Sequence, residues 1–179
     1  MNMVQSKANM SIEMLLQGLQ VTRTAILSEI EMLTDTEVNT KPRRDKWSII
    51  QILHHLHLVE QSVTSALLYG LHKNERNPVT HKNLQIMLDR TAKREAPQHM
   101  EPTETLMKKQ QMIQLLRNSR EALVNALHTV VNEKDLIEKS LRHPVFHDLN
   151  LYQWIQVLDL HEQRHLTQLK EAKYSIYKR

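Results

Sequence analysis

Apolar side chains recur at helical spacing in four long stretches of this sequence, and the first stretch runs from about Ser11 to Leu33. Its repeating apolar positions are Ile12, Leu15, Leu16, Leu19, Ile26 and Ile30. Apolar residues three or four positions apart fall on one face of a helix, so this stretch is predicted to be an amphipathic helix. The linker TDTEVNTKPRRDK follows, and Pro42 within it marks the break.

The second predicted helix has a well-marked start. Ser48 is a favourable N-cap, and Gln51 three residues later completes a capping box. Trp47, just before the cap, is placed to pack on Ile52 as a hydrophobic staple. We expect this helix to end at about Gly70, since glycine often terminates helices.

A long irregular connection separates the second predicted helix from the third. Residues 71–102 contain only a short helical patch, NLQIMLDR, and a connection of this length in a compact domain often shapes a functional site. The third helix is predicted from about Thr103 to Val131. Its apolar stripe consists of Leu106, Ile113, Leu116, Leu123, Leu127 and Val130.

The fourth predicted helix opens like the second. Asn150 is its cap, Gln153 is the capping-box partner, and Leu149 is placed to pack on Trp154; the helix runs to about Ala172. Four amphipathic helices without any strand pattern predict an all-α fold, a four-helix bundle. The length of 179 residues suits a single domain that spans residues 1–179.

The composition supports a helical, globular chain. Apolar residues make up 40% and charged residues 25%, and two glycines and five prolines are too few for a turn-rich β fold. The absence of cysteine excludes disulfides and a thiol nucleophile from the protein itself. The first residues lack the pattern of a secretory leader, and no apolar run reaches the ~18 residues of a membrane span, so a cytoplasmic location is expected.

A formal charge of +4 raises the question of nucleic acid binding. However, the basic residues are interspersed with nearly as many acidic ones, and two tryptophans, four tyrosines and one phenylalanine offer little surface for base stacking. A mildly basic solvated surface is therefore the better interpretation, and nucleic acid is not an expected partner. The methionines, Met14, Met32 and Met112 among them, are interpreted as core filling.

Two histidines lie on the face that the fourth helix should bury. With a turn of about 100° per residue, one stripe contains Trp154, Val157, Leu158, His161, His165, Gln168, Leu169 and Ala172. A single histidine there could be a core residue satisfied by one hydrogen bond. Two imidazoles one turn apart can instead converge on a divalent metal ion, which would satisfy both rings.

A third ligand should come from a facing helix, and the second helix offers LHHLHLVE. On the helical wheel His54 points toward water, His57 lies off one flank, and His55 lies on the other flank, where an imidazole can still reach inward. Glu60 falls within the apolar stripe. It is a candidate hydrogen-bond partner of a ligand, a fourth ligand or a general base, and the alternative is a half-exposed position at a helix crossing.

The segments KPRRDKWSIIQILHHLHLVE, residues 41–60, and HEQRHLTQL, residues 161–169, resemble the DinB/YfiT-like superfamily of helical-bundle proteins, and the likeness covers nearly the whole chain. The histidine eight positions after Trp47 is His55. The resemblance implies that His55, His161 and His165 form a three-histidine site for a divalent ion such as nickel, zinc or iron. Some similar proteins have histidine at the position of Glu60.

The resemblance also implies a range of activities. Similar proteins include transferases and isomerases that use low-molecular-weight thiols such as bacillithiol or mycothiol, and others are described as hydrolases; many form homodimers. Three imidazoles leave a coordination position open, as in catalytic zinc sites. The leading hypothesis is therefore a metal-dependent enzyme that acts on a small molecule, either a small-thiol S-transferase or a hydrolase. The alternative is a non-catalytic metal-binding or interaction bundle.

Overall fold

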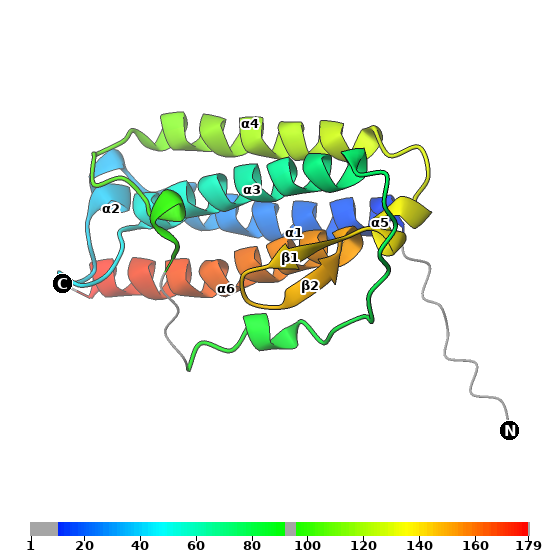
Figure 1. Ribbon diagram of the computed structural model, residues 1–179. Helices are drawn as coiled ribbons and strands as arrows, with labels where there is room; N and C mark the ends of the chain where they lie inside the picture. Colours follow the sequence, from blue (N-terminus) through cyan, green and yellow to red (C-terminus); the bar gives the residue numbers. More distant parts are fainter. Residues whose placement is uncertain (1–10, 92–95, 179) are drawn as a thin grey trace, which may run out of the picture.

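Four long helices lie side by side in the computed structural model, which describes residues 11–91 and 96–178 (Figure 1). They are α1 (Ile12–Ile30), α3 (Ile49–His72), α4 (Lys109–His128) and α6 (Leu151–Tyr177). The predicted four-helix bundle is confirmed. Residues 1–10, 92–95 and 179 of the predicted single domain lie outside the described residues. No helix in the described ranges combines the length and the apolar character needed to cross a membrane.

The helices α3 and α6 begin at the predicted caps, but the prediction of one capping hydrogen bond is wrong. The hydroxyl of Ser48 accepts from the Gln51 N–H, and the Gln51 side chain accepts from the Ser48 N–H, so the capping box of α3 is confirmed. Asn150 caps α6 by accepting from the Gln153 N–H. The predicted reciprocal bond from Gln153 is wrong, because its amide instead pairs with both backbone groups of Lys82.

Contrary to the prediction, Gly70 does not end α3 and has a packing role instead. The helix α3 continues two residues further, to His72. A Cβ atom at position 70 would lie 2.5 Å from Cδ2 of Leu151, so any larger residue would displace this side chain where α3 approaches the start of α6. The reason for this residue is close packing and not a left-handed turn.

The segment before α4 is not helical, so the prediction of a start near Thr103 is wrong. The Asn39 amide donates to the Met107 carbonyl and accepts from its N–H, which holds this backbone outside the helical ladder. Asn39 ends α2 (Asp35–Asn39), a short helix within the stretch predicted to be a linker. Leu106, predicted to be part of the apolar stripe, is 77% exposed.

A small β-hairpin precedes α6, although no strand was predicted. After the short helix α5 (Lys134–Glu138), strands β1 (Ser140–His143) and β2 (His147–Asn150) pair antiparallel, with Ser140 opposite Asn150. His147, the first residue of β2, adopts a positive φ of 57° directly after the tight connection. Each strand contains a single leucine, Leu141 or Leu149, among polar residues, so the sequence shows no alternation of apolar and polar positions.

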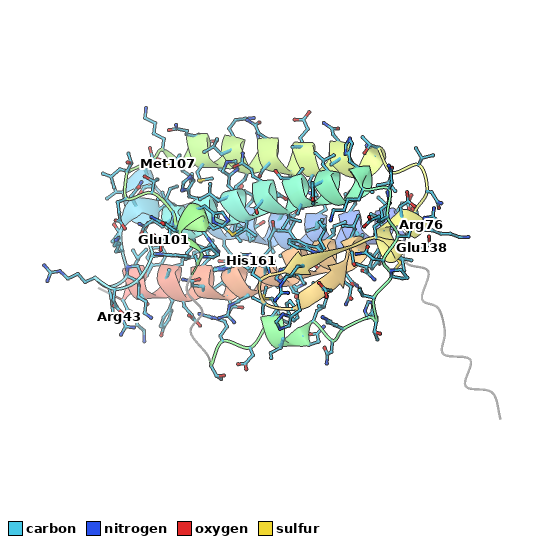
Figure 2. The ribbon with its side chains drawn as sticks, in the orientation of Figure 1. Arg43, Arg76, Glu101, Met107, Glu138 and His161 are labelled. Carbon is cyan, nitrogen blue, oxygen red and sulfur yellow. The ribbon has the colours of Figure 1, made fainter. Side chains whose placement is uncertain are left out.

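The long connection between α3 and α4 crosses one face of the bundle. It contains the 3₁₀ turns η1 (Gln85–Met87) and η2 (Gln98–Met100), which contact α6 and α3 respectively. It begins near Arg76, which pairs with Glu138 at one end of the molecule (Nη1–Oε2 2.7 Å), and ends near Met107 at the other (Figure 2). Arg164 of α6 also donates to the carbonyls of Met87 and Asp89.

The bundle core consists of two main apolar clusters, and every long helix contributes to both. Along α1, Leu19 belongs to one cluster and Ile26 to the other. Polar side chains that are buried lie between them, including Arg23 of α1. Met112 is fully buried as predicted, but Met14 and Met32 are 54% and 88% exposed, so the interpretation of these two as core residues is wrong.

Candidate metal centre

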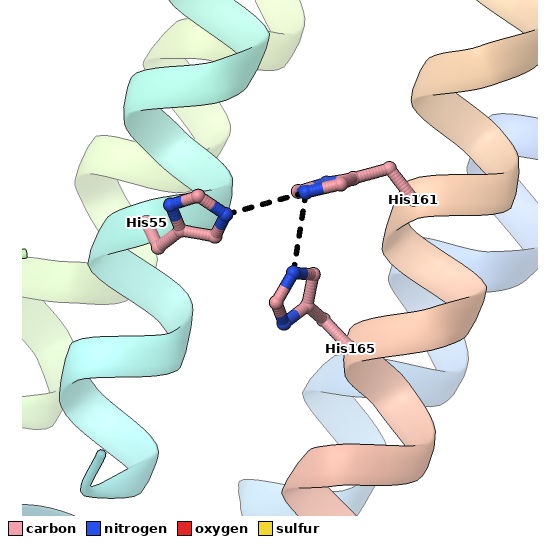
Figure 3. Close-up of side chains that lie close together, drawn as sticks. All are labelled: His55, His161 and His165. Atoms are coloured by element: carbon pink, nitrogen blue, oxygen red, sulfur yellow. Dashed lines mark hydrogen bonds between the residues drawn. The ribbon is translucent and has the colours of Figure 1, made fainter. Parts of the chain in front are cut away.

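Three imidazoles converge between α3 and α6 (Figure 3). His55 comes from α3, whereas His161 and His165 come from successive turns of α6. The Nε2 atom of His161 lies 3.2 Å from Nε2 of His55 and 3.2 Å from Nε2 of His165. Because all three potential ligand atoms lie within 4.8 Å of one another, the group could hold a metal ion.

The outer ring nitrogens of two histidines are held by acceptors. His55 Nδ1 lies 2.8 Å from the Met100 carbonyl, and His165 Nδ1 lies 2.7 Å from Oε1 of Gln168. These oxygens can only accept, so both Nδ1 atoms carry the proton, and each neutral ring then has a lone pair on Nε2. Both lone pairs face the third ring, which is the arrangement that a metal ligand requires.

His161 lies between the other two rings. Its Nε2 can donate a proton to at most one of its two neighbours. Its Nδ1 is buried and has no hydrogen-bond partner within the described ranges. Three inward-facing nitrogens therefore share at most one proton, and a cation at their centre would satisfy all three.

Burial keeps these rings neutral. Burial lowers the pKa of His161 well below its ordinary value, and the neighbouring His165 and His55 reinforce the shift. Burial, assisted by the charge of His55, lowers the pKa of His165 to about 3. Burial also lowers the pKa of His55, although its bond to Met100 opposes the shift. Neutral imidazole is the form that binds metals.

Trp47 forms one wall of the cluster. Its ring centroid lies 5.0 Å from that of His55 and 6.4 Å from that of His165, with the latter pair stacked. Trp47 also packs against the apolar cluster to which Ile52 belongs, and the predicted direct contact between these two residues stays a prediction. A hollow of about 390 Å³ borders the tryptophan. Its lining residues are Pro42, Arg43, Lys46, Trp47, Gln168, Glu171, Ala172, Tyr174, Ser175 and Lys178.

The structure separates His54 and His57 from the cluster formed with His55. His54, predicted to point toward water, is half-buried, and its Nδ1 accepts from the Thr103 N–H at 3.1 Å. His57 is 7% exposed and stacks on His54 with ring centroids 6.2 Å apart. The preference of the helical wheel for His55 over both neighbours agrees with the geometry.

Glu60 is fully buried, so the alternative of a half-exposed position is wrong. Its Oε1 accepts from Nε of Arg120 at 2.5 Å, and its Oε2 accepts from Nη2 of Arg23 at 3.0 Å and from the Ser119 hydroxyl at 2.5 Å. Burial alone would raise the pKa of this carboxyl. The charges of Arg23 and Arg120 act in the opposite direction and outweigh burial, so the pKa lies below its ordinary value. Its predicted catalytic role remains a prediction.

The main omission from the sequence-based prediction is Glu162, beside His161 on α6. It is fully buried, and its Oε1 accepts from Nη2 of Arg120 at 2.7 Å and from Nη2 of Arg23. Two arginines and two glutamates thus form one ion cluster. The signal was present at Arg23, which stands four positions after Leu19 and three before Ile26 on the apolar stripe of the first helix.

His143 is a further buried histidine, but it serves the hairpin. Its Nδ1 accepts from the N–H groups of Val145 and Phe146, and its ring lies edge-on to Trp154 with centroids 4.7 Å apart. Burial lowers its pKa to about 4.

Comparisons with known proteins agree with this architecture. The model of the DinB superfamily matches residues 13–169. The chain is 35% identical over 149 residues to the uncharacterised protein YuaE of Bacillus subtilis (strain 168), and the match covers 83% of this chain and 91% of YuaE.

Two solved structures share the fold. TT2238, a four-helix bundle protein, matches with a TM-score of 0.62 and 18% identity over 90% of this chain and 99% of its own. YfiT from Bacillus subtilis, described as a probable metal-dependent hydrolase with an unusual four-helix bundle topology, matches with a TM-score of 0.66 and 15% identity over 97% of this chain and 92% of its own.

Proposed function

The chain belongs to the DinB superfamily, and we propose that it is a divalent-metal-dependent enzyme whose ligands are His55, His161 and His165. The observation that carries the proposal is the convergence of three Nε2 atoms, two of which are left unprotonated by the acceptors behind their rings. Without a cation, at least one of the three inward-facing nitrogens would keep an unsatisfied lone pair.

Two of the three separations between the nitrogens suit a tetrahedral metal ion. Two nitrogens bound at about 2.0–2.1 Å to a tetrahedral ion lie roughly 3.3 Å apart. The two separations that involve His161 are 3.2 Å. Neutral imidazole ligands suit zinc, nickel and iron alike, so the choice among these metals is open to measurement.

The chain itself would orient the ligands and leave room for a substrate. Met100 and Gln168 fix the rings of His55 and His165, and Trp47 shields both rings on one side. Three protein ligands leave at least one coordination position open. A bound divalent ion would supply Lewis acidity there, which lowers the pKa of a water or thiol. The hollow beside Trp47 and Gln168 is lined by none of the three histidines, so we propose it only as a neighbouring surface for a small molecule.

Hydrolysis of a small substrate is the first reaction class, and the description of YfiT as a probable metal-dependent hydrolase supports it. Transfer of a low-molecular-weight thiol to an electrophile is the second. This chain contains no cysteine, so in that reaction the thiol would enter with the cosubstrate. In either case the open position is the point where the nucleophile would be activated.

Elemental analysis of purified protein, before and after reloading with zinc, nickel and iron, tests the proposal. We expect close to one metal per chain in the wild type and almost none in a variant with His55→Ala, His161→Ala and His165→Ala. The matched control replaces three exposed histidines, His81, His99 and His128, with alanine and should retain the metal. A wild-type content below about a tenth of an equivalent after reloading would contradict the proposal.

A second measurement separates a catalytic site from a structural one. Stripping the metal with a chelator should lower the melting temperature only slightly if the bundle folds without it. The two extensive apolar clusters of the core predict this result. A large loss of stability would favour the non-catalytic metal-binding bundle.

A further inference from the structure

The ion cluster of Arg23, Glu60, Arg120 and Glu162 joins all four long helices. Arg23 comes from α1, Glu60 from α3, Arg120 from α4 and Glu162 from α6. Two positive and two negative groups balance, and each arginine binds both carboxylates. No side chain of the four is more than 11% exposed. The cluster therefore lies inside the bundle, where its charges are poorly screened by solvent.

Its two carboxylates belong to the two helices that carry the candidate ligands. Glu162 is the residue after His161 on α6, and Glu60 follows His55 by five positions on α3. At about 1.5 Å per residue, five positions correspond to roughly 7.5 Å along a helix axis. The contact that fixes α3 against α6 is thus within two turns of the three imidazoles.

We infer that this cluster is a positioning device that sets the register of α3 against α6 and so brings His55 onto His161 and His165. The inference rests on the proposed metal site. Arg23 and Arg120 reach both carboxylates at once, because each guanidinium presents several donors in a rigid plane. A shift of either helix by one residue would separate a buried charge from its partner, so the cluster defines one alignment where an apolar interface would tolerate several.

The cluster is not an optimal source of stability. Nε of Arg23, Nη1 of Arg120 and Oε2 of Glu162 are buried without a hydrogen-bond partner in the part of the chain that the structure describes. Buried polar groups in this state are costly, and apolar side chains of similar volume often serve a core equally well. Apolar clusters already occupy the bundle on both sides of this layer. Alignment of the ligand-bearing helices accounts for its presence better than stability does.

The test variant combines Arg120→Met with Glu162→Gln. It removes one charge of each sign and leaves the pair of Arg23 and Glu60 in place. Arg120→Lys is the second variant, because it keeps the positive charge without the fork that reaches both carboxylates. The control is Leu127→Ala, which truncates a buried side chain in one apolar cluster. Ile52 and Leu56, which flank His55 on α3, belong to the other cluster. Urea unfolding places all variants on one scale of stability.

The first readout needs no metal. In chelator-treated protein, the ring N–H resonances of His55 and His165 report their bonds to Met100 and Gln168. We expect both resonances to shift or broaden in the double variant and to remain in place in Leu127→Ala. Unchanged resonances in the double variant would overturn the inference, whether or not the wild type binds metal.

The second readout is cobalt binding, measured by the affinity and the visible spectrum of the Co²⁺ protein. We expect an affinity at least tenfold weaker and an altered spectrum in the double variant, a smaller change in Arg120→Lys, and neither change in Leu127→Ala. Wild-type affinity and spectrum in the double variant would overturn the inference. A wild type that binds no cobalt, zinc, nickel or iron would overturn the proposed function, and the ring resonances would still decide the question of alignment.

Discussion

His165 donates its Nδ1–H to the Gln168 side chain across 2.7 Å, and this bond turns Nε2 of the same ring toward His161. The donor and the acceptor lie three residues apart on α6, so one turn of helix supplies both a candidate ligand and the group that orients it. His55 is oriented in the same way by a carbonyl of the connection, at Met100. One candidate ligand on α3 and one on α6 are therefore each oriented by an acceptor behind the ring.

Gln168→Leu should weaken metal binding by about 10- to 100-fold, the usual effect of losing a partner behind a ligating histidine. The fold should persist, since Gln168 is only partly buried. Affinity measured by competition with a chromogenic chelator checks this. Gln163→Leu makes the same change on α6 at a side chain bonded to Asp159. Its affinity should match that of the wild type, and an equal loss in both variants would show that Gln168 has no special role.

Glu60→Gln should destabilise the protein by about 3 kcal/mol or more, because it leaves buried guanidinium charge without full compensation. Arg23 and Arg120 both bind this carboxylate. Denaturant unfolding of the metal-free protein gives the loss directly. If stability stays near that of the wild type while the rate falls and the residual activity loses one limb of its pH–rate profile, Glu60 would instead be the general base.

The long helices were predictable because their buried apolar residues recur at helical spacing and their capping residues are close together in the sequence. The capping box of Ser48 and Gln51 involves residues three apart, so the sequence contains all of it. The start of α4 was not predictable in this way. It depends on Asn39, which holds the backbone of Met107 from a distant part of the chain. A rule that reads only neighbouring residues extends the helix to Thr103.

The same distinction applies to the site. His161 and His165 stand out because they interrupt an apolar stripe one turn apart. The wheel of the second helix prefers His55 only modestly, and the family resemblance assigns it as the third ligand. Glu162 does not stand out, since an acidic residue on a long helix is most often solvated. Its burial becomes understandable only beside Arg23 and Arg120 from two other helices. Pairing between distant helices is a tertiary property that periodicity does not contain.

Gly70→Ala should destabilise the bundle by roughly 1–3 kcal/mol, the usual cost of overpacking. The added methyl group would lie 2.5 Å from a methyl carbon of Leu151 at the junction of α3 and α6. Gly18→Ala is the matched control, because its methyl group would lie 3.3 Å from the nearest atom, an oxygen of Asp159. Helix propensity there favours alanine by up to about 1 kcal/mol. Equal melting temperatures for the two variants would contradict the packing role of Gly70.

The stability of the metal-free protein should fall as the pH is lowered through the range in which free histidine titrates. Burial lowers the pKa of His143 to about 4 and that of His165 to about 3 in the folded protein. In the unfolded chain both would titrate near their ordinary value of about 6.5. Between about pH 6.5 and pH 4, the unfolded state therefore binds more protons, so stability rises with pH in this window. Each such group contributes about 1.4 kcal/mol per pH unit.

His143→Gln isolates one of these contributions away from the candidate ligands. Urea unfolding at pH 5, 6 and 7 in the presence of chelator should give a pH dependence that is smaller than that of the wild type by about 1.4 kcal/mol per unit at pH 5. The bond from the hairpin N–H groups to Nδ1 can be partly replaced by the glutamine oxygen, so folding should survive. His128→Gln changes an exposed histidine and should leave the slope unaltered. A wild-type slope in His143→Gln would mean that this ring is protonated in the folded protein, against the burial that the structure gives it.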